Sequence, residues 1–316
     1  MLPRGSQVRG LTLPGALAIA LTLSCVGCGL LGLGRDLEGL ELGLMTFNIR
    51  HGTADDGPNS WPQRRHLVVQ LLQQNGADVV GLQEALHFQL QEICQALPHY
   101  ACVGVGRDDG AEAGEFAALL YRKDRLAVEE SGTFWFSDTP EVPGSMSWGN
   151  QIPRICTWAR LRHRRTCMAF SVFNVHLDHV SQRSRERSVQ LLAERISMHS
   201  PTAPVFVLGD LNAGPHNPVV AFLKGSAKLA TDEGGQVSNP FPLVDTYRAI
   251  HADTSAIGTY HAFTGDRSGA KIDYIFAAPG VNVKDAHIDH TSAHGRYPSD
   301  HFPVTARVVV PLARER

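Results

Sequence analysis

The 316-residue sequence contains no internal repeat, no low-complexity block and no apolar run long enough to span a bilayer comfortably. Charged residues are not abundant: they make up 19% of the chain, and hydrophobic residues make up 43%. These values are ordinary for a globular protein and exclude disorder as its main character. A chain of this length can bury a large core, as one large domain or two small ones.

Cysteine is scarce, and no group of the six cysteines has the spacing of a zinc site. Two of them, Cys25 and Cys28, lie near the amino terminus. The other four are Cys94, Cys102, Cys156 and Cys167. Cys156 and Cys167 flank a polar stretch, 162–165, that is typical of a hairpin turn, so a bridge between them is possible, but the sequence does not fix the pairing.

The sequence also lacks an excess of basic residues. Its formal net charge is -2, and without residues 1–28 it becomes -4, with 27 basic against 31 acidic residues. A protein that holds long nucleic acid by its phosphates usually carries a broad basic surface. The charge therefore favours a small or locally bound substrate.

Residues 1–28 differ from the rest of the chain, because two arginines precede an apolar run from Leu11 to Leu23 that is followed by small residues. This pattern predicts an export signal. The segment 26–28 resembles part of a bacterial lipobox, with Cys28 as the modified residue, although Cys25 stands where leucine is usual. An ordinary cleaved signal peptide is the alternative.

We therefore expect an exported protein. It is either a lipoprotein on the outer face of a bacterial membrane, touching that membrane only through its lipid, or a secreted or periplasmic protein. Residues 29–41 have the Gly/Leu composition of a linker, and residues 42–312 form the predicted folded domain.

Polar side chains follow several predicted strands at the point where each strand ends. The clearest case is the apolar stretch 205–208, which runs through Gly209 into Asp210 and Asn212. In extended geometry residues two apart point the same way, so a carboxylate and an amide would converge on one point. A turn is the plain alternative, since Asp, Asn and Gly favour turns.

Three other predicted strands end in the same manner, at Asn48, Glu84 and His176. Each has a structural alternative: Asn48 could shape a turn, Glu84 could cap a helix, and a lone histidine such as His176 is often a hydrogen-bonded core residue. Asp300 and His301 precede the last strand and could be loop residues. The combination is harder to explain by structure alone.

Helices are expected between the strands. One begins after Ser60, with Pro62 in its first turn, and ends at Asn75-Gly76. Another covers 183–198, and a short one follows Asn217. The strands are too many for one sheet, so we predict an α/β fold with two mixed sheets packed face to face and helices outside.

Together these segments resemble the endonuclease/exonuclease/phosphatase superfamily, the DNase I-like metal-dependent phosphoesterases. The matching segments, in order, are MTFNIR with Asn48, GLQE with Glu84, NVHLDH with His176, LGDLNA with Asp210 and Asn212, KIDYIF with Asp273, and SDH with Asp300 and His301. They span residues 42–310, and the resemblance implies a four-layer α/β sandwich with the site at one edge of both sheets. The family commonly has arginine at Lys271, so a bidentate contact there is in question.

The resemblance also implies roles. Asn48, Glu84 and Asp300 would bind Mg²⁺ or Mn²⁺, as one or two ions, because these are hard oxygen ligands. Asp210, held by Asn212, would orient or deprotonate the attacking water, while His176, and His301 aligned by Asp273, would bind the phosphoryl oxygens. Arg154 and His261 are weaker candidates for the substrate phosphate, and Asp245 and His179 are weaker still.

We therefore expect a divalent-metal-dependent phosphoesterase that works by in-line water attack, and we expect it to be a monomer. The loops 51–60 and 138–153, with Trp61 and Trp148, could enclose a small phosphoester. An extracellular DNase I-like nuclease is the alternative within the enzyme class, so nucleic acid remains a candidate partner. A non-catalytic binding module on the same fold is the alternative outside that class.

Overall fold

The computed structural model describes residues 39–311 apart from 201–202 and 254. The expected export signal (1–28), most of the expected linker and residue 312 lie outside the described residues. Within the described part of the chain, no helix is both long enough and apolar enough to cross a membrane.

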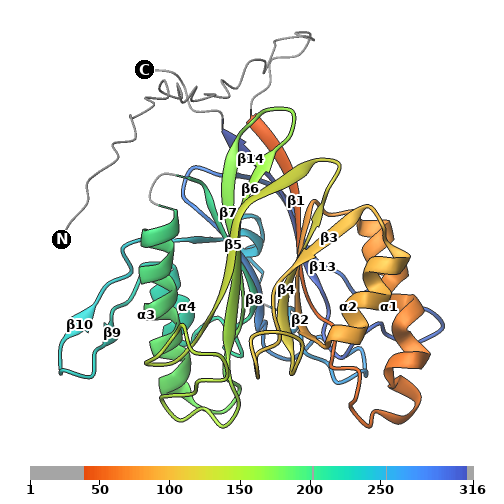
Figure 1. The fold of residues 1–316 in the computed structure, drawn as a ribbon, viewed down its shortest axis with the longest axis horizontal. Helices are drawn as coiled ribbons and strands as arrows, with labels where there is room; N and C mark the ends of the chain where they lie inside the picture. Colours follow the sequence, from red (N-terminus) through yellow and green to blue (C-terminus); the bar gives the residue numbers. More distant parts are fainter. Residues whose placement is uncertain (1–38, 201–202, 254, 312–316) are drawn as a thin grey trace, which may run out of the picture. The chain divides into compact units, whose positions relative to one another are not determined.

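Two six-stranded mixed sheets form the centre of the fold (Figure 1). The first has the order β13 (Asn282–Ile288), β14 (Val304–Pro311), β1 (Gly39–Asn48), β2 (Val79–Ala85), β4 (Phe116–Arg122) and β3 (Tyr100–Val103). The second has the order β11 (Val244–Asp245), β12 (Asp273–Ala277), β8 (Val205–Asp210), β7 (Ala169–His176), β6 (Ile155–His163) and β5 (Leu126–Trp135). A short hairpin of β9 (Leu229–Ala230) and β10 (Gln236–Val237) stands apart from both sheets.

Helices cover the outer face of each sheet (Figure 1). The first sheet packs against α1 (Trp61–Asn75) and α2 (His87–Ala96), and the second against α3 (Gln182–His199) and α4 (Pro218–Leu223). The short helices are η1 (Gly57–Asn59) and α5 (Thr246–Ile250). As predicted, α1 has proline in its first turn and ends at Gly76, which adopts φ 62°.

The strand β8 shows why the layers form. Its side chains alternate, with Val205 and Val207 buried against the helices and Phe206 and Leu208 buried against the first sheet. A strand covered on both faces must be apolar throughout, as this one is. The same alternation in both sheets gives one apolar layer between the sheets and one under each helix pair, which confirms the predicted four-layer sandwich.

One sequence-based expectation was wrong, and one disulfide bridge that the sequence left open is ruled out. Residues 39–41 belong to β1 rather than to the linker, because β14 continues far enough to pair Gly39 with Pro311, and Leu40 is buried between the sheets. A bridge between Cys156 and Cys167 does not form, since Cys156 is a free thiol. Cys156 lies opposite Val175 in the β6–β7 pair, at the end of β7 away from Cys167.

Candidate active site

The topology brings the ends of eight strands to one edge of the sandwich. The parallel pairs β1–β2 and β7–β8 place their carboxyl ends there, and the strands antiparallel to them, β4, β6, β12 and β14, place their amino ends there. The motif residues lie at these ends or just beyond them. The structure therefore gathers segments that are more than 250 positions apart, from Asn48 to His301.

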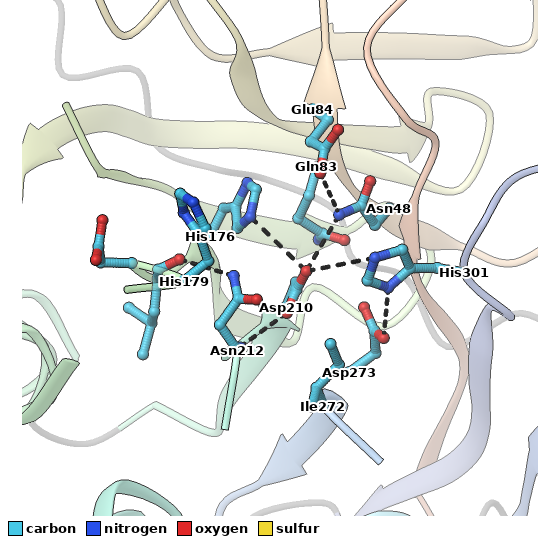
Figure 2. A network of polar contacts seen from close by, with 12 residues as sticks. Asn48, Gln83, Glu84, His176, His179, Asp210, Asn212, Ile272, Asp273 and His301 are labelled. Carbon is cyan, nitrogen blue, oxygen red and sulfur yellow. Dashed lines mark hydrogen bonds and ion pairs between the residues drawn. The ribbon is translucent and has the colours of Figure 1, made fainter. Parts of the chain in front are cut away.

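The alternation of side chains decides which motif residues face the space between the sheets. Asn48, His176, Asp210 and Asp273 have the same parity as the residues of their strands that are buried between the sheets. They therefore emerge together at the edge of that layer (Figure 2). Glu84 has the opposite parity, but a β-bulge between Leu82 and Ala85 and a left-handed φ of 59° turn it toward the site.

Asp210 is the centre of the polar network (Figure 2). Its Oδ2 accepts a hydrogen bond of 3.1 Å from Nδ2 of Asn48. The same oxygen lies 3.7 Å from Nε2 of His176 and 3.9 Å from Nε2 of His301. Two imidazole nitrogens thus face one carboxylate oxygen at distances slightly longer than a hydrogen bond, so one reacting group beside them can contact all three side chains.

The geometry at Asn212 differs from the predicted one. The strand ends at Asp210, and Asn212 has a left-handed φ of 47°, so the two side chains do not extend in parallel. Instead the backbone N–H of Asn212 donates to Oδ1 of Asp210 at 2.8 Å, and its side chain donates to the carbonyl of Leu177. Asn212 therefore fixes Asp210 through its main chain.

The close backbone approach expected at Gly209 is present, because a Cβ there would lie 2.1 Å from the Val175 carbonyl oxygen.

His301 and Asp273 form a buried hydrogen-bonded pair. Nδ1 of His301 lies 2.9 Å from Oδ2 of Asp273, which directs Nε2 toward Asp210. Burial alone would lower the pKa of His301, but the charge and hydrogen bond of Asp273 outweigh burial and raise that pKa to about 10. His301 is therefore an imidazolium at neutral pH.

The pKa values of the other two central groups, Asp210 and His176, are shifted in ways that suit different tasks. Burial, reinforced by repulsion from Asp273, raises the pKa of the Asp210 carboxyl to about 7. Burial and the nearby guanidinium of Arg154 hold the pKa of His176 well below its usual value, so His176 is a neutral imidazole. A base with a pKa near 7 is well matched to proton abstraction at physiological pH.

Glu84 and Asp300 form an acidic pair beside this centre. Each has a carboxylate oxygen 3.9 Å from the guanidinium of Arg50, and both side chains are largely buried. Burial, with repulsion from Glu84, raises the pKa of Asp300. Burial also acts to raise the pKa of Glu84, but hydrogen bonding by Asn48, together with the charge of His301, lowers it overall. Asn48 connects this pair to the centre, since its Nδ2 donates to both Glu84 and Asp210 while its Oδ1 accepts from the N–H of Arg50.

Two groups of side chains could accommodate a metal ion. Ligand atoms of Asp210, Asp273 and His301 lie within 4.8 Å of one another. However, His301 already uses Nδ1 for Asp273 and carries a proton, which repels a cation. The two carboxylates of Glu84 and Asp300 lie 3.9 Å from Arg50, which is their ion-pair partner among the described residues, so this oxygen-rich pair fits a hard divalent cation better.

The weaker candidates have mostly structural contacts. Arg154 is buried between Asp178, at 3.4 Å, and His179, at 2.7 Å, yet its Nη1 has no hydrogen-bond partner in the described structure. The ring of His261 stacks on Phe302, and its main-chain N–H donates to the Asp300 carbonyl.

Lys271, Asp245 and Trp61 do not line the site. Lys271 is fully buried and pairs with Asp245, which caps α5, so neither faces Asp210. The ring of Trp61 is buried on α1 and donates to Glu92, so it does not line the site.

The sequence-based prediction missed Glu115 and Arg50. Oε2 of Glu115 lies 3.9 Å from Nδ1 of His176, and Glu115 in turn forms a two-point contact with Arg107. We looked for polar residues after strands, whereas Glu115 precedes β4, whose amino end reaches the same edge because β4 is antiparallel to β2. Arg50 stands within the segment MTFNIR and could have been found as the cation nearest to the acids.

This fold and this edge define a class of protein: the DNase I-like sandwich, in which acids and histidines from the ends of two facing sheets share one site. Residues 45–301 match the endonuclease/exonuclease/phosphatase family. The chain belongs to that family.

Solved structures agree with this assignment. The endonuclease/exonuclease/phosphatase of Bacteroides vulgatus is 34% identical, covers 85% of this chain and 98% of its own, and superposes with a TM-score of 0.77. The mannosyl-6-phosphatase of Bacteroides thetaiotaomicron is 31% identical, covers 85% of this chain and all (100%) of its own, and has a TM-score of 0.75.

Among curated relatives, Nocturnin of Drosophila melanogaster is 27% identical over 309 residues, which are 84% of this chain and 46% of that protein. The chain spans about half the length of the curated relatives it matches, 59% in one case and 46% in the other.

Proposed function

We propose that this protein is an exported, divalent-metal-dependent phosphoesterase that hydrolyses a small phosphoester. The observation that carries the proposal is the convergence of two histidine Nε2 atoms on one carboxylate, at 3.7 and 3.9 Å, beside a separate pair of acids. A non-catalytic module has no need of these groups together. Export rests on residues 1–28, whose sequence has the features of a signal.

Asp210 acts as the general base. With a pKa of about 7 it can take the proton of a water held between it and the phosphorus, and the N–H of Asn212 keeps its second oxygen in place. The attack is in line, and no covalent intermediate is needed.

His301 and His176 bind the phosphoryl oxygens through Nε2. His301 donates as an imidazolium that Asp273 holds in position, and His176 donates as a neutral ring. Arg154 can add its unpartnered Nη1. Such fixed donors stabilise the negative charge that develops on the pentacovalent phosphorus.

Glu84 and Asp300, with Oδ1 of Asn48 nearby, hold the metal ion. Mg²⁺ or Mn²⁺ bound there supplies a Lewis acid that offsets charge on a phosphate oxygen. The protein contributes the two carboxylates, and Arg50 lies 3.9 Å from each of them.

A sugar phosphate is the first substrate class to test, because a 31% identical neighbour is a mannosyl-6-phosphatase.

The positions of the dense basic segments also favour a small substrate over long DNA. The turn 162–165 joins the ends of β6 and β7 that are far from His176. At 3.3 Å per residue, the start of β7 at Ala169 lies about 23 Å along the strand from His176. Arg183 and Arg187 pair with Asp232.

The test is hydrolysis of sugar phosphates, inositol phosphates, phospholipid headgroups and plasmid DNA with and without EDTA. We expect Mg²⁺ or Mn²⁺ to restore activity after EDTA, and Glu84→Gln to lower kcat/KM by roughly two orders of magnitude or more. Glu194→Gln, an exposed acid on α3, is the matched control and should behave as wild type. Full activity of a metal-free Glu84→Ala variant would contradict the proposal.

A further inference from the structure

Arg64 is a buried cation with an unusual set of partners. It lies on α1 and is 1% exposed, yet it forms no ion pair in the described part of the chain. Its guanidinium donates four hydrogen bonds, all of them to main-chain carbonyls. The acceptors are Asn59 at 2.9 Å from Nε, Ile49 at 2.6 Å and Pro298 at 3.0 Å from Nη1, and Arg50 at 2.9 Å from Nη2. Burying a cation in this way is costly unless its donors are used.

Three of these carbonyls belong to the two segments that lead to the acidic site. Ile49 and Arg50 follow Asn48 directly, and Pro298 precedes Asp300 by two residues. One segment leaves β1 and the other leads into the neighbouring strand β14, and the hydrogen-bond ladder of these strands stops at this end with the pair Thr46 and Val304. Beyond that pair, Nη1 of Arg64 donates to a carbonyl on each side, and the Ser299 hydroxyl donates to the Asn48 carbonyl at 2.7 Å, so these contacts continue the connection between the two segments.

The turn at Arg50 depends on the same contact. Arg50 has a left-handed φ of 54°, which is uncommon for a residue with a large side chain. Its carbonyl accepts from Nη2 of Arg64 and from Nε2 of Gln89. Its side chain donates two hydrogen bonds to Asp56 and lies 3.9 Å from Glu84 and from Asp300. The planar guanidinium of Arg64 is itself held by ring contacts with Trp61 and Phe263, at 5.2 and 5.7 Å.

We propose that Arg64 is a positioning residue that sets the separation of Glu84 and Asp300, and with it the affinity of their site for a divalent cation. It contacts neither acid. It acts through the main chain on both sides of the site, and this inference rests on the proposed function. Lysine cannot replace it, because an ammonium is a point donor, whereas the four carbonyls are arranged around a planar fork.

The experiment compares Arg64→Lys and Arg64→Met with Arg65→Met. Arg65 is the neighbour on the same helix, has a half-exposed side chain and pairs with Glu92, so it controls for loss of an α1 cation. Mg²⁺ affinity is measured by calorimetry and by the rise in melting temperature on adding Mg²⁺. Activity is measured as a function of Mg²⁺ concentration.

We expect Arg64→Lys to fold and to bind Mg²⁺ about 10- to 100-fold more weakly, as outer-shell changes at metal sites do. Its kcat should rise toward the wild-type value at saturating Mg²⁺, and Arg65→Met should match wild type throughout. Should Arg64→Met not fold, the lysine variant still decides the question.

Two failures are distinguishable. A purely structural Arg64 would give a lower melting temperature with an unchanged Mg²⁺ dissociation constant, which overturns this inference and leaves the proposed function standing. If wild-type protein binds neither Mg²⁺ nor Mn²⁺ and hydrolyses no phosphoester, the proposed function falls and the inference with it.

Discussion

At the scale of single residues, the site works by giving similar side chains different environments. His176 and His301 face the same oxygen of Asp210, yet one is neutral and the other charged. The difference comes from the carboxylate beside Nδ1 of each ring. Asp273 lies 2.9 Å from Nδ1 of His301. The carboxylate of Glu115 is 3.9 Å from Nδ1 of His176 and also binds Arg107.

The pair of Asp273 and His301 should therefore behave as a unit in catalysis. Asp273→Asn and His301→Gln should each lower kcat by about 10²- to 10⁴-fold, and the double variant should cost little more than either. His287→Gln is the control, because His287 also contacts an aspartate but is exposed on β13. If the two losses simply add on a logarithmic scale, Asp273 has a separate structural role.

The charge on His301 should also appear in the stability of the metal-free protein. Because the folded pKa, about 10, exceeds the unfolded value near 6.5, the contribution is fully present below pH 6.5 and is lost as the pH rises to 10. The slope is at most about 1.4 kcal/mol per pH unit. Lys271, whose pKa burial lowers to about 8, opposes this trend above pH 8.

Urea unfolding in EDTA measures the effect. The difference in unfolding free energy between wild type and His301→Gln should shrink from pH 7 to pH 9, and the subtraction removes the contribution of Lys271. A difference that stays constant over this range would show that His301 is not charged in the folded protein.

At the scale of elements, a buried polar network connects the two sheets just behind the site. Asn174 on β7 accepts from Nε2 of Gln83 on β2 at 2.6 Å and donates to the carbonyls of Leu82 and Ala118, at 2.9 and 2.8 Å. Hydrogen bonds are directional, whereas the surrounding apolar contacts are not. The network therefore fixes how β2, which carries Glu84, lies against β7, which carries His176.

Asn174→Leu should destabilise the protein by about 2–4 kcal/mol, because it leaves several buried polar groups unpaired. It should also lower activity more than it lowers the folded fraction, since both sheets carry site residues. Chemical denaturation and kcat measured on the folded variant test this, with the exposed Asn282→Ala on β13 as control. A change below about 0.5 kcal/mol, the size of an ordinary surface substitution, would mean that the network does not hold the sheets.

At the scale of the whole molecule, the charge distribution predicts the response to salt. An enzyme that grips DNA through six to ten phosphates loses about 10³- to 10⁵-fold in affinity between roughly 50 and 200 mM salt. The net charge of this chain is -2, its basic run at 162–165 lies at the far ends of β6 and β7, and Arg183 and Arg187 pair with Asp232. We expect hydrolysis of a small phosphoester to change by less than about tenfold over that range, because one phosphate releases few counterions.

Rates on a sugar phosphate and on plasmid DNA at both salt concentrations provide the measurement. Efficient plasmid cleavage that falls steeply with salt would identify a nuclease and overturn the preference for small substrates.

The sequence by itself determined the class of fold and most of the residues that lie together at the candidate site. Strand period, helix boundaries such as Gly76, and the polar residues after Leu208 and Val175 are local properties, and local physics fixes them. The order of the motifs then indicated the family.

Only the tertiary structure decided which polar residues meet. Glu115 entered the site because its strand is antiparallel to β2, Lys271 was excluded because it pairs with Asp245, and Arg64 acquired the carbonyl of Pro298, which is 234 positions away. Strand direction, pairing and burial depend on contacts between distant parts of the chain. The spacing of residues along one segment carries no information about such contacts.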